Sequence, residues 1–266
     1  ARTEMIADGI ADARIVVTGQ PTLEAWRRAA AEVDATYVRR RLRAELVRRT
    51  AGAPEVGHVL TWAGQYGEGY EEVLGAFLRS VAPVLAADTS LLLVLSPHPR
   101  VNGNVERSAI GGVRRRASES VADRILLAPS GLSTMELATV SDVVLTWAST
   151  VGTQAAFMGK EVIYVSPPVR FDDFLVQAGA TRRAEVCVLA AADAEPAAAA
   201  EAEPGPVLQP GSLPAVISQA LDNPHAPEDI RSILVEAGYV LNADEVVAGM
   251  IAEVVGASHP PPTSDR

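Results

Sequence analysis

Residues 141–165, with the sequence SDVVLTWASTVGTQAAFMGKEVIYV, predict a buried strand, a tight turn of small residues, a short helix and a second buried strand. The apolar run at 143–147 is continuous, which is typical of a strand covered on both faces of a parallel sheet. It stops at a group of small residues, and the predicted helix at 151–158 ends at Gly159. The second strand is predicted at 161–165. The stretch therefore predicts a strand-helix-strand unit.

The turn inside this unit has the composition of an anion-binding site. Ser149 is predicted to cap the helix, and the backbone N–H groups of Thr150, Val151 and Gly152 lie at the positive end of the helix dipole. Two hydroxyls and several amides would then converge on one point, where a phosphate group can bind. The alternative is that Ser149 and Thr150 only cap a structural helix.

The rest of the chain repeats the same alternation of apolar runs and helical patterns. Such alternation predicts strand-helix-strand units and a parallel sheet. The fold class predicted is therefore α/β, a doubly wound parallel sheet with C-terminal helices. Candidate strands lie at 14–18, 58–63, 91–95, 124–128, 143–147, 161–165 and 186–189, and candidate helices at 22–49, 69–87, 105–117, 135–139, 151–158, 172–177, 213–221, 227–237 and 243–255.

Small, polar and basic residues follow the predicted strands at the point where each strand ends. Gln65 and Gly67 lie in a Gly-rich turn, His98 and Arg100 follow the next strand, and Ser130 follows the one after that. In an open parallel sheet, ligands bind beyond the carboxyl ends of the strands. We therefore expect these residues and the 149–152 turn to line one binding edge.

The individual motifs leave alternatives open. The Gly-rich turn GQYGEG is neither the dinucleotide fingerprint nor a phosphate loop of the P-loop type, and it would also serve as a plain strand-to-helix connection. His98 lies between two prolines, where its imidazole can donate to a phosphate or read a base edge, and Arg100 adds a fixed positive charge. The alternative is a surface histidine in a proline-rich loop.

Composition excludes several other classes of protein and site. The net charge of −10 argues against nucleic acid as a partner, because phosphate neutralisation needs clustered Lys and Arg. The histidines and the single Cys187 show no metal-ligand spacing, so we expect neither a metal nor a cofactor. No apolar run approaches the roughly 20 residues that cross a bilayer. These features predict a cytoplasmic protein.

One local exception to the acidic composition is the arginine-rich segment 26–49. It can be interpreted as a basic face for an anionic partner, such as the inner surface of a membrane. The alternative is a solvated helix whose arginines pair with Glu24, Glu32 and Glu45.

These motifs together resemble a known family. The order of strand, Gly-rich turn, helix, strand, His-Pro, helix, strand, STVG turn and GKEVIYV strand resembles the C-terminal, donor-binding domain of GT-B glycosyltransferases over about 58–181. The pairs His98-Pro99 and Ser149-Thr150 look like those with which bacterial sialyltransferases and capsule polysaccharide Kdo transferases contact the CMP of a CMP-sugar. The resemblance implies that His98 meets the nucleotide or its phosphate, and that Ser149, Thr150 and the amides through Gly152 hold the phosphate.

A second resemblance concerns the beginning of the chain. Residues 5–26 are similar to the segment that joins the two halves of UDP-N-acetylglucosamine 2-epimerases and related GT-B proteins. The epimerase pattern has Asp-Ser-Gly-Gly followed by paired glutamates, whereas this chain has 148-ASTV-151 and Gln154-Ala155. Without those carboxylates, epimerisation is the less favoured reading. GT-B proteins also carry an N-terminal domain ahead of this segment, so the resemblance implies either a fragment or a half that recruits a separate N-terminal half.

The resemblance implies the following division and role. Residues 1–50 end an N-terminal half and form a linker helix, 51–189 bind a nucleotide sugar, 190–210 form a flexible insertion, 211–257 are helices and 258–266 are a disordered tail. The role implied is donor binding in a glycosyltransferase of cell-surface glycan biosynthesis, with a nucleotide sugar and a glycan acceptor as partners. Alternatives are a non-catalytic nucleotide-sugar-binding module and a UDP-sugar enzyme of the epimerase type.

Overall fold

The computed structural model describes most of the chain, and the account below concerns that part. The predicted strand at 14–18, the insertion at 190–210 and the tail at 259–266 lie outside the described residues, as does most of the predicted helix at 172–177. The described residues are 2–12, 20–50, 55–166, 175–176, 178–186, 211–236, 240 and 243–258.

The centre of the fold is a six-stranded sheet with the order β3-β2-β1-β4-β5-β6, in which every neighbouring pair is parallel. The chain places β2 and then β3 outward from β1, crosses back, and places β4, β5 and β6 on the other side of β1. This confirms the predicted doubly wound α/β fold. The strands are β1 (His58–Ala63), β2 (Leu91–Ser96), β3 (Ile125–Leu127), β4 (Val143–Thr146), β5 (Glu161–Val165) and β6 (Arg182–Ala184).

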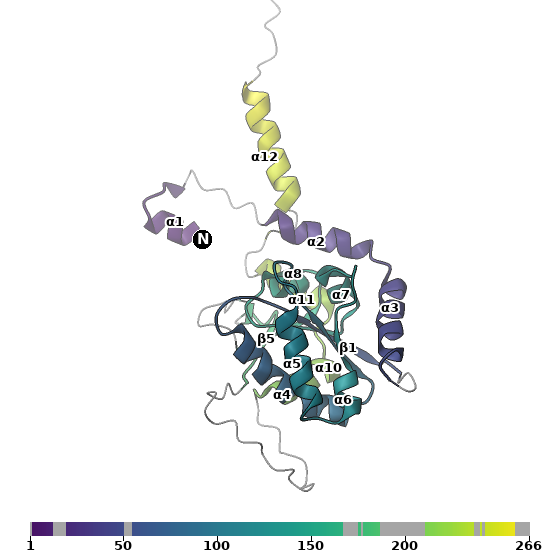
Figure 1. The fold of residues 1–266 in the computed structure, drawn as a ribbon. Coiled ribbons are helices and arrows are strands. Elements are labelled where there is room, and N and C mark those ends of the chain that lie inside the picture. The colour runs from purple at the N-terminus through teal and green to yellow at the C-terminus, as the bar shows by residue number, and fades with distance from the viewer. Residues whose placement is uncertain are drawn as a thin grey trace, which may run out of the picture.

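Helices cover both faces of the sheet, and two more extend from it. Clusters of buried residues join α4, α5, α6 and α10 to one face, and α3, α7, α8 and α11 to the other. Figure 1 shows α12 rising from α2, away from the sheet. The helices are α1 (Arg2–Ala7), α2 (Pro21–Ala31), α3 (Ala35–Val47), α4 (Tyr70–Ala87), α5 (Asn104–Arg114), α6 (Glu119–Asp123), α7 (Thr134–Val140), α8 (Thr150–Phe157), α10 (Leu213–Asp222), α11 (Pro227–Glu236) and α12 (Ala243–Ser258).

The apolar runs of the strands fill both sides of this core. Successive side chains of a strand point to opposite faces, so a strand covered on both faces needs apolar residues throughout. In β1, Leu60 and Trp62 pack under α4, and Val59 packs under α3 and α7. The ring of Trp62 stacks on Phe77 of α4 with centroids 4.2 Å apart.

The single helix predicted at 22–49 is wrong, because the structure divides it into α2 and α3. α2 ends at Ala31 and α3 begins at Ala35. The carboxylate of Asp34 accepts a hydrogen bond from the Tyr37 backbone N–H at 2.9 Å, so this residue caps a new helix instead of continuing the old one. Helical propensity along 22–49 does not indicate that a second helix begins at Ala35.

Two further boundaries differ from the prediction. The predicted helix at 105–117 ends at Arg114 and is followed by the separate helix α6. The sequence did not predict β6 at Arg182–Ala184, and of the strand predicted at 186–189 only Val186 lies within the described residues. Because β6 pairs only with β5 at the edge of the sheet, it needs no long apolar run. The Arg182 guanidinium instead forms an ion pair with the buried carboxylate of Glu161.

The arginines of α3 and its end are largely occupied within the molecule. Arg39 donates to the Val140 carbonyl at 2.9 Å, Arg41 to the Ser130 carbonyl at 3.0 Å, and Arg49 to the Ile125 carbonyl at 3.4 Å. Arg48 and Arg49 also pair with Glu45. These contacts support the internal-pairing interpretation of the basic segment over an open basic face. Within the described residues, no helix is long and apolar enough to span a membrane.

Candidate functional site

The topology predicts a crevice at the carboxyl ends of β1 and β4. These neighbouring strands lead to helices on opposite faces of the sheet, because β1 continues into α4 and β4 into α8. The loops therefore part at this point, and open α/β sheets bind ligands at such a switch point. The loops concerned are 64–69 after β1 and 147–149 after β4.

The two loops are joined by a side chain of the first. Gln65 Nε2 donates a hydrogen bond to the Ala148 carbonyl at 2.9 Å. Its own Oε1 accepts from the Tyr66 backbone N–H at 3.1 Å. Gln65 therefore uses both ends of its amide to fix the shape of the crevice rather than to reach a ligand.

The next residue, Tyr66, joins the crevice to the loop after β2. Its ring lies against the ring of His98, with centroids 4.5 Å apart and planes tilted by 55°. The Arg100 guanidinium donates to the Tyr66 hydroxyl at 2.7 Å. Tyr66 is 43% exposed, so the cluster of Tyr66, His98 and Arg100 forms an open rim beside the crevice.

The surroundings of His98 determine its protonation and its tautomer. Burial, and then the positive charge of Arg100, lower the pKa of His98, so the ring is neutral at pH 7. His98 Nδ1 accepts a hydrogen bond from the Arg100 backbone N–H at 3.2 Å. The proton of the neutral ring is therefore on Nε2, and His98 presents a hydrogen-bond donor.

The N-terminus of α8 lies on the β4 side of the crevice. Ser149 caps the helix as predicted, because its hydroxyl accepts from the Val151 N–H at 3.3 Å. The Gly152 N–H donates to the Ser149 carbonyl at 3.0 Å, so the amides of Val151 and Gly152 are both engaged within the turn. Ser149 is 5% exposed, whereas Thr150 is exposed. In the described part of the chain the Thr150 N–H has no acceptor, so Thr150 is the accessible member of the turn.

Gly152 has a further role in packing. A Cβ at this position would lie 2.4 Å from the Tyr164 hydroxyl and 2.6 Å from its Cζ. Real side chains do not approach so closely, so α8 can lie this near to β5 only with glycine at 152. The glycine thus sets the position of the turn that Ser149 and Thr150 form.

A buried polar network supports the Gly-rich turn from below. The Tyr70 hydroxyl donates to Glu106 Oε1 at 2.7 Å and accepts from Trp62 Nε1 at 3.1 Å. Burial, and then the Glu106 carboxylate, raise the pKa of Tyr70. A Cβ at Gly64 would lie 2.7 Å from the Ser96 carbonyl and 3.0 Å from both Glu106 Oε1 and the Tyr70 hydroxyl. Glycine is therefore required where β1 enters the crevice.

The structure brings most of the predicted site residues to one rim. Gly67 has a φ of 109°, which favours glycine, and lies in the same loop as Gln65. No contact within the described residues joins the Ser130 side chain to this rim, although its carbonyl accepts from Arg41. The predicted site residues that lie on the rim or in the adjoining turn are Gln65, His98, Arg100, Ser149, Thr150, Val151 and Gly152.

Two aromatic residues of the crevice were missed by the sequence analysis. Tyr66 joins two loops, and Trp147 follows β4 with its ring stacked on Tyr70 at 6.4 Å between centroids. A tyrosine inside a Gly-rich turn is the one signal that could have identified Tyr66. Trp147 was counted as the last residue of a buried strand. Within the described ranges, no group of three or more His, Cys, Asp and Glu lies together as a metal site would require.

Comparison with known proteins finds likeness in fold and none in sequence family. No protein-family model and no curated protein matches the sequence. UDP-GlcNAc 2-epimerase from Neisseria meningitidis, solved with UDP-GlcNAc, has a TM-score of 0.59 at 13% identity over 95% of this chain and 58% of that one. MnaA from S. aureus, solved with UDP, has a TM-score of 0.61 at 16% identity over 98% of this chain and 60% of that one.

A sugar-phosphate synthase shares the same fold. Trehalose 6-phosphate synthase from Burkholderia multivorans has a TM-score of 0.51 at 15% identity over 92% of this chain and 51% of that one. The chain therefore spans about 51–60% of the length of these three proteins. Identities this low show a shared fold alone, and in fold the match agrees with the predicted resemblance to GT-B proteins.

Proposed function

We propose that this chain is the donor-binding half of a glycosyltransferase, and that it binds the nucleotide of a nucleotide sugar in the crevice between the loops after β1 and β4. The acceptor proposed is a glycan of the cell surface. Because nucleotide sugars are cytoplasmic metabolites, the role implies a cytoplasmic location.

The main support for the proposal is that side-chain contacts join the loops after β1, β2 and β4 at the switch point. Gln65 connects the loop after β1 to the loop after β4, and Tyr66 connects it to the loop that holds His98 and Arg100. The rim therefore combines a neutral donor, a fixed cation and a helix N-terminus on one edge of the sheet. Similar proteins with this fold were solved with UDP-GlcNAc or UDP.

Each group has a chemical role in this proposal. His98 Nε2–H and the Arg100 guanidinium donate to phosphate or base oxygens of the nucleotide. The hydroxyl and the free N–H of Thr150, at the positive end of the α8 dipole, donate to the phosphate adjacent to the sugar. As the bond to the sugar breaks, negative charge grows on the departing nucleotide phosphate, and these donors stabilise it electrostatically. The proposal invokes neither a metal ion nor a cofactor.

A partner half is part of the proposal. The chain matches only 58% and 60% of the two UDP-sugar proteins, whose remaining residues have no counterpart in this match. In a glycosyltransferase of two halves, the second half would supply acceptor contacts and a general base. We therefore propose that turnover requires an N-terminal half, on the same polypeptide or on a separate subunit, and that the 266 residues alone can act as a non-catalytic nucleotide-sugar-binding module.

The likeness to two UDP-sugar proteins favours a second candidate, a UDP-sugar enzyme of the epimerase type. The composition of α8 argues against an epimerase-type reaction. This helix has the sequence TVGTQAAF and carries no carboxylate. The pattern of the epimerase family has paired glutamates at this point. Analysis of the products formed from UDP-GlcNAc would distinguish the two candidates.

Isothermal titration calorimetry of the purified chain with CMP, CDP, UMP and UDP tests the proposal. We expect saturable binding of one of these nucleotides that weakens about tenfold in His98→Ala and again in Thr150→Val, because each change removes a hydrogen bond to a charged group. Preference for CMP would assign a CMP-sugar donor, and preference for UDP a UDP-sugar donor.

A matched control is available in Ser130→Ala, because Ser130 follows β3 and has no side-chain contact with the rim in the described structure. We expect this variant to bind as the wild type does. Equal affinities of the wild type, His98→Ala and Thr150→Val would contradict the proposed site, and transfer of sugar by the chain without any added half would contradict the need for a partner.

A further inference from the structure

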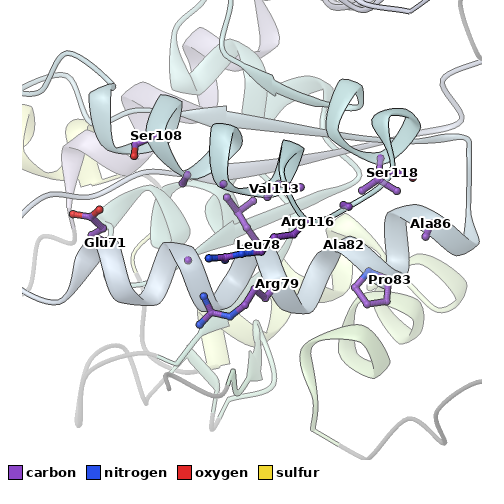
Figure 2. A pocket seen from close by; sticks show the side chains of 15 residues that line it. Glu71, Leu78, Arg79, Ala82, Pro83, Ala86, Ser108, Val113, Arg116 and Ser118 are labelled. Carbon is purple, nitrogen blue, oxygen red and sulfur yellow. The ribbon is translucent and has the colours of Figure 1, made fainter. Parts of the chain in front are cut away.

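A groove of about 540 Å³ lies between α4 and the pair α5 and α6, outside the nucleotide crevice (Figure 2). Its lining runs along α4 from Glu71 to Ala86, and along the facing helices from Ser108 to Val121. None of the residues proposed above to bind the nucleotide lines this groove. It is therefore a second concave surface with its own chemistry.

The floor and walls of the groove are apolar. Leu78, Val113 and Val121 are buried members of the core that form its floor. Ala82 and Ala109 are only partly buried, although both pack on the same core cluster. Small residues on both helices thus leave apolar surface accessible along the length of the groove, where larger side chains would have filled it.

Two arginines lie over this apolar surface without an anionic partner. In the described part of the chain, neither Arg79 nor Arg116 has a side-chain hydrogen bond or ion pair, whereas Arg114 of the same region pairs with Asp123 at 3.2 Å. Figure 2 shows both side chains directed toward the end of the groove at which Glu71 lies. One exposed carboxylate therefore faces two guanidinium groups, and a net positive charge remains.

The groove is long, and its charged side chains lie toward one end. From Glu71 to Ala86, α4 rises about 22 Å at 1.5 Å per residue. Both guanidinium groups are directed toward the Glu71 end, whereas the lining around Ala82, Pro83 and Ala86 carries no charge. A cationic end with an apolar remainder matches a ligand that has an anionic head and a hydrocarbon chain.

We propose that the groove binds a single-chain anionic amphiphile. The hydrocarbon chain lies along Leu78, Ala82 and Val113, and the phosphate or carboxylate head lies between the guanidinium groups of Arg79 and Arg116. Apolar burial supplies the affinity, and charge complementarity fixes the direction in which the chain lies.

Calorimetric titration of the full chain with decyl phosphate tests this inference. Inorganic phosphate supplies the head without the chain, and decyl maltoside supplies the chain without the charge. We expect saturable one-to-one binding of decyl phosphate, and at least tenfold weaker binding of each of the other two probes. Failure of decyl phosphate to bind, or equal binding of decyl maltoside, would overturn the proposal.

Charge variants locate the head group. We expect Arg79→Gln and Arg116→Gln each to weaken decyl phosphate binding about fivefold. Arg43→Gln should leave it unchanged, because Arg43 is exposed on α3, which packs on the opposite face of the sheet. Glu71→Gln removes the opposing carboxylate and should strengthen binding. Unchanged affinity in the double variant Arg79→Gln with Arg116→Gln would overturn the assignment of the head group.

Substitutions at two adjacent glycines test where the hydrocarbon chain of the amphiphile lies. Gly112 lines the groove and Gly111 does not, and neither has a positive φ, so leucine can replace either without backbone strain. A Cβ at either position would lie no closer than 3.7 Å to the nearest atom, which belongs to Arg115. We expect Gly112→Leu to abolish binding and Gly111→Leu to preserve it. Binding that survives Gly112→Leu would place the amphiphile elsewhere and overturn the proposal.

Discussion

The side-chain amide of Gln65 donates to the backbone carbonyl of Ala148 at 2.9 Å and so ties together two loops that belong to opposite faces of the sheet. The loop after β1 leads into α4 and the loop after β4 leads into α8. Within the described residues, no backbone hydrogen bond joins these loops, so Gln65 provides the polar link between the two sides of the proposed nucleotide crevice.

Replacing Gln65 with leucine should loosen this connection. Loss of one partly buried hydrogen bond costs about 1 kcal/mol of unfolding free energy, and it leaves the Ala148 carbonyl without its donor. We expect faster amide hydrogen exchange at 147–150 and little change in the rest of the sheet. Glu68→Ala, an exposed change in the same loop, is the control. Identical exchange in the two variants would show that Gln65 does not hold the loops.

Adding a methyl group at Gly152 should move α8 away from the sheet. The new Cβ would meet the Tyr164 ring, so we expect a loss of about 1–3 kcal/mol in the free energy of unfolding. Gly112→Ala on α5 would bring its Cβ no closer than 3.9 Å to the Arg115 side chain, an ordinary contact, and should be neutral or stabilising, since alanine is the better helix former. Denaturant unfolding of the two variants makes the comparison, and equal stability would contradict the packing role.

The titration of His98 should respond to its neighbour Arg100. Burial lowers the pKa of His98 most and the charge of Arg100 second, so Arg100→Gln should raise the pKa without restoring its ordinary value. Because the folded-state pKa is lowered, His98 favours the unfolded state as the pH falls through its ordinary range, and Arg100→Gln should lessen that effect. NMR titration of the ring Cε1–H measures the midpoint. A midpoint that Arg100→Gln leaves in place would contradict the assigned cause.

The buried hydroxyl of Tyr70 should contribute strongly to the free energy of unfolding. Tyr70→Phe leaves the fully buried Glu106 carboxylate without its donor, and Glu106 Oε2 already has no partner in the described structure. We expect a loss of about 3 kcal/mol in thermal or denaturant unfolding. In a background of Glu106→Leu, the same change at Tyr70 should cost much less. Equal costs in both backgrounds would show that the two residues are not coupled.

The central strands could be predicted because their chemistry is uniform. β1, β2, β4 and β5 are covered on both faces, so each is a continuous apolar run, and the order of elements around them identifies the switch point. The edge strand β6 carries two arginines and gave no such signal. The start of α3 depends on the side chain of Asp34, which helical periodicity does not report.

The site could be predicted only in part, for a similar reason. Positions after strands identified His98, Arg100 and the 149–152 turn, since the topology must bring such positions to one edge. The contact of Tyr66 with both His98 and Arg100 depends on how two loops bend toward each other, and residue spacing carries no record of that. Nor does spacing show that Gly152 is needed against Tyr164.

The contact of Arg49 with the Ile125 carbonyl has a consequence for the behaviour of the protein in concentrated solution. β3 is the outermost strand on its side, and Arg124 uses its carbonyl to accept from Leu93 of β2, so the Ile125 carbonyl turns to the open side. Unpaired groups on such an edge are a template for strands from other molecules. By occupying that carbonyl, Arg49, which follows the end of α3, opposes edge-to-edge aggregation of the sheet.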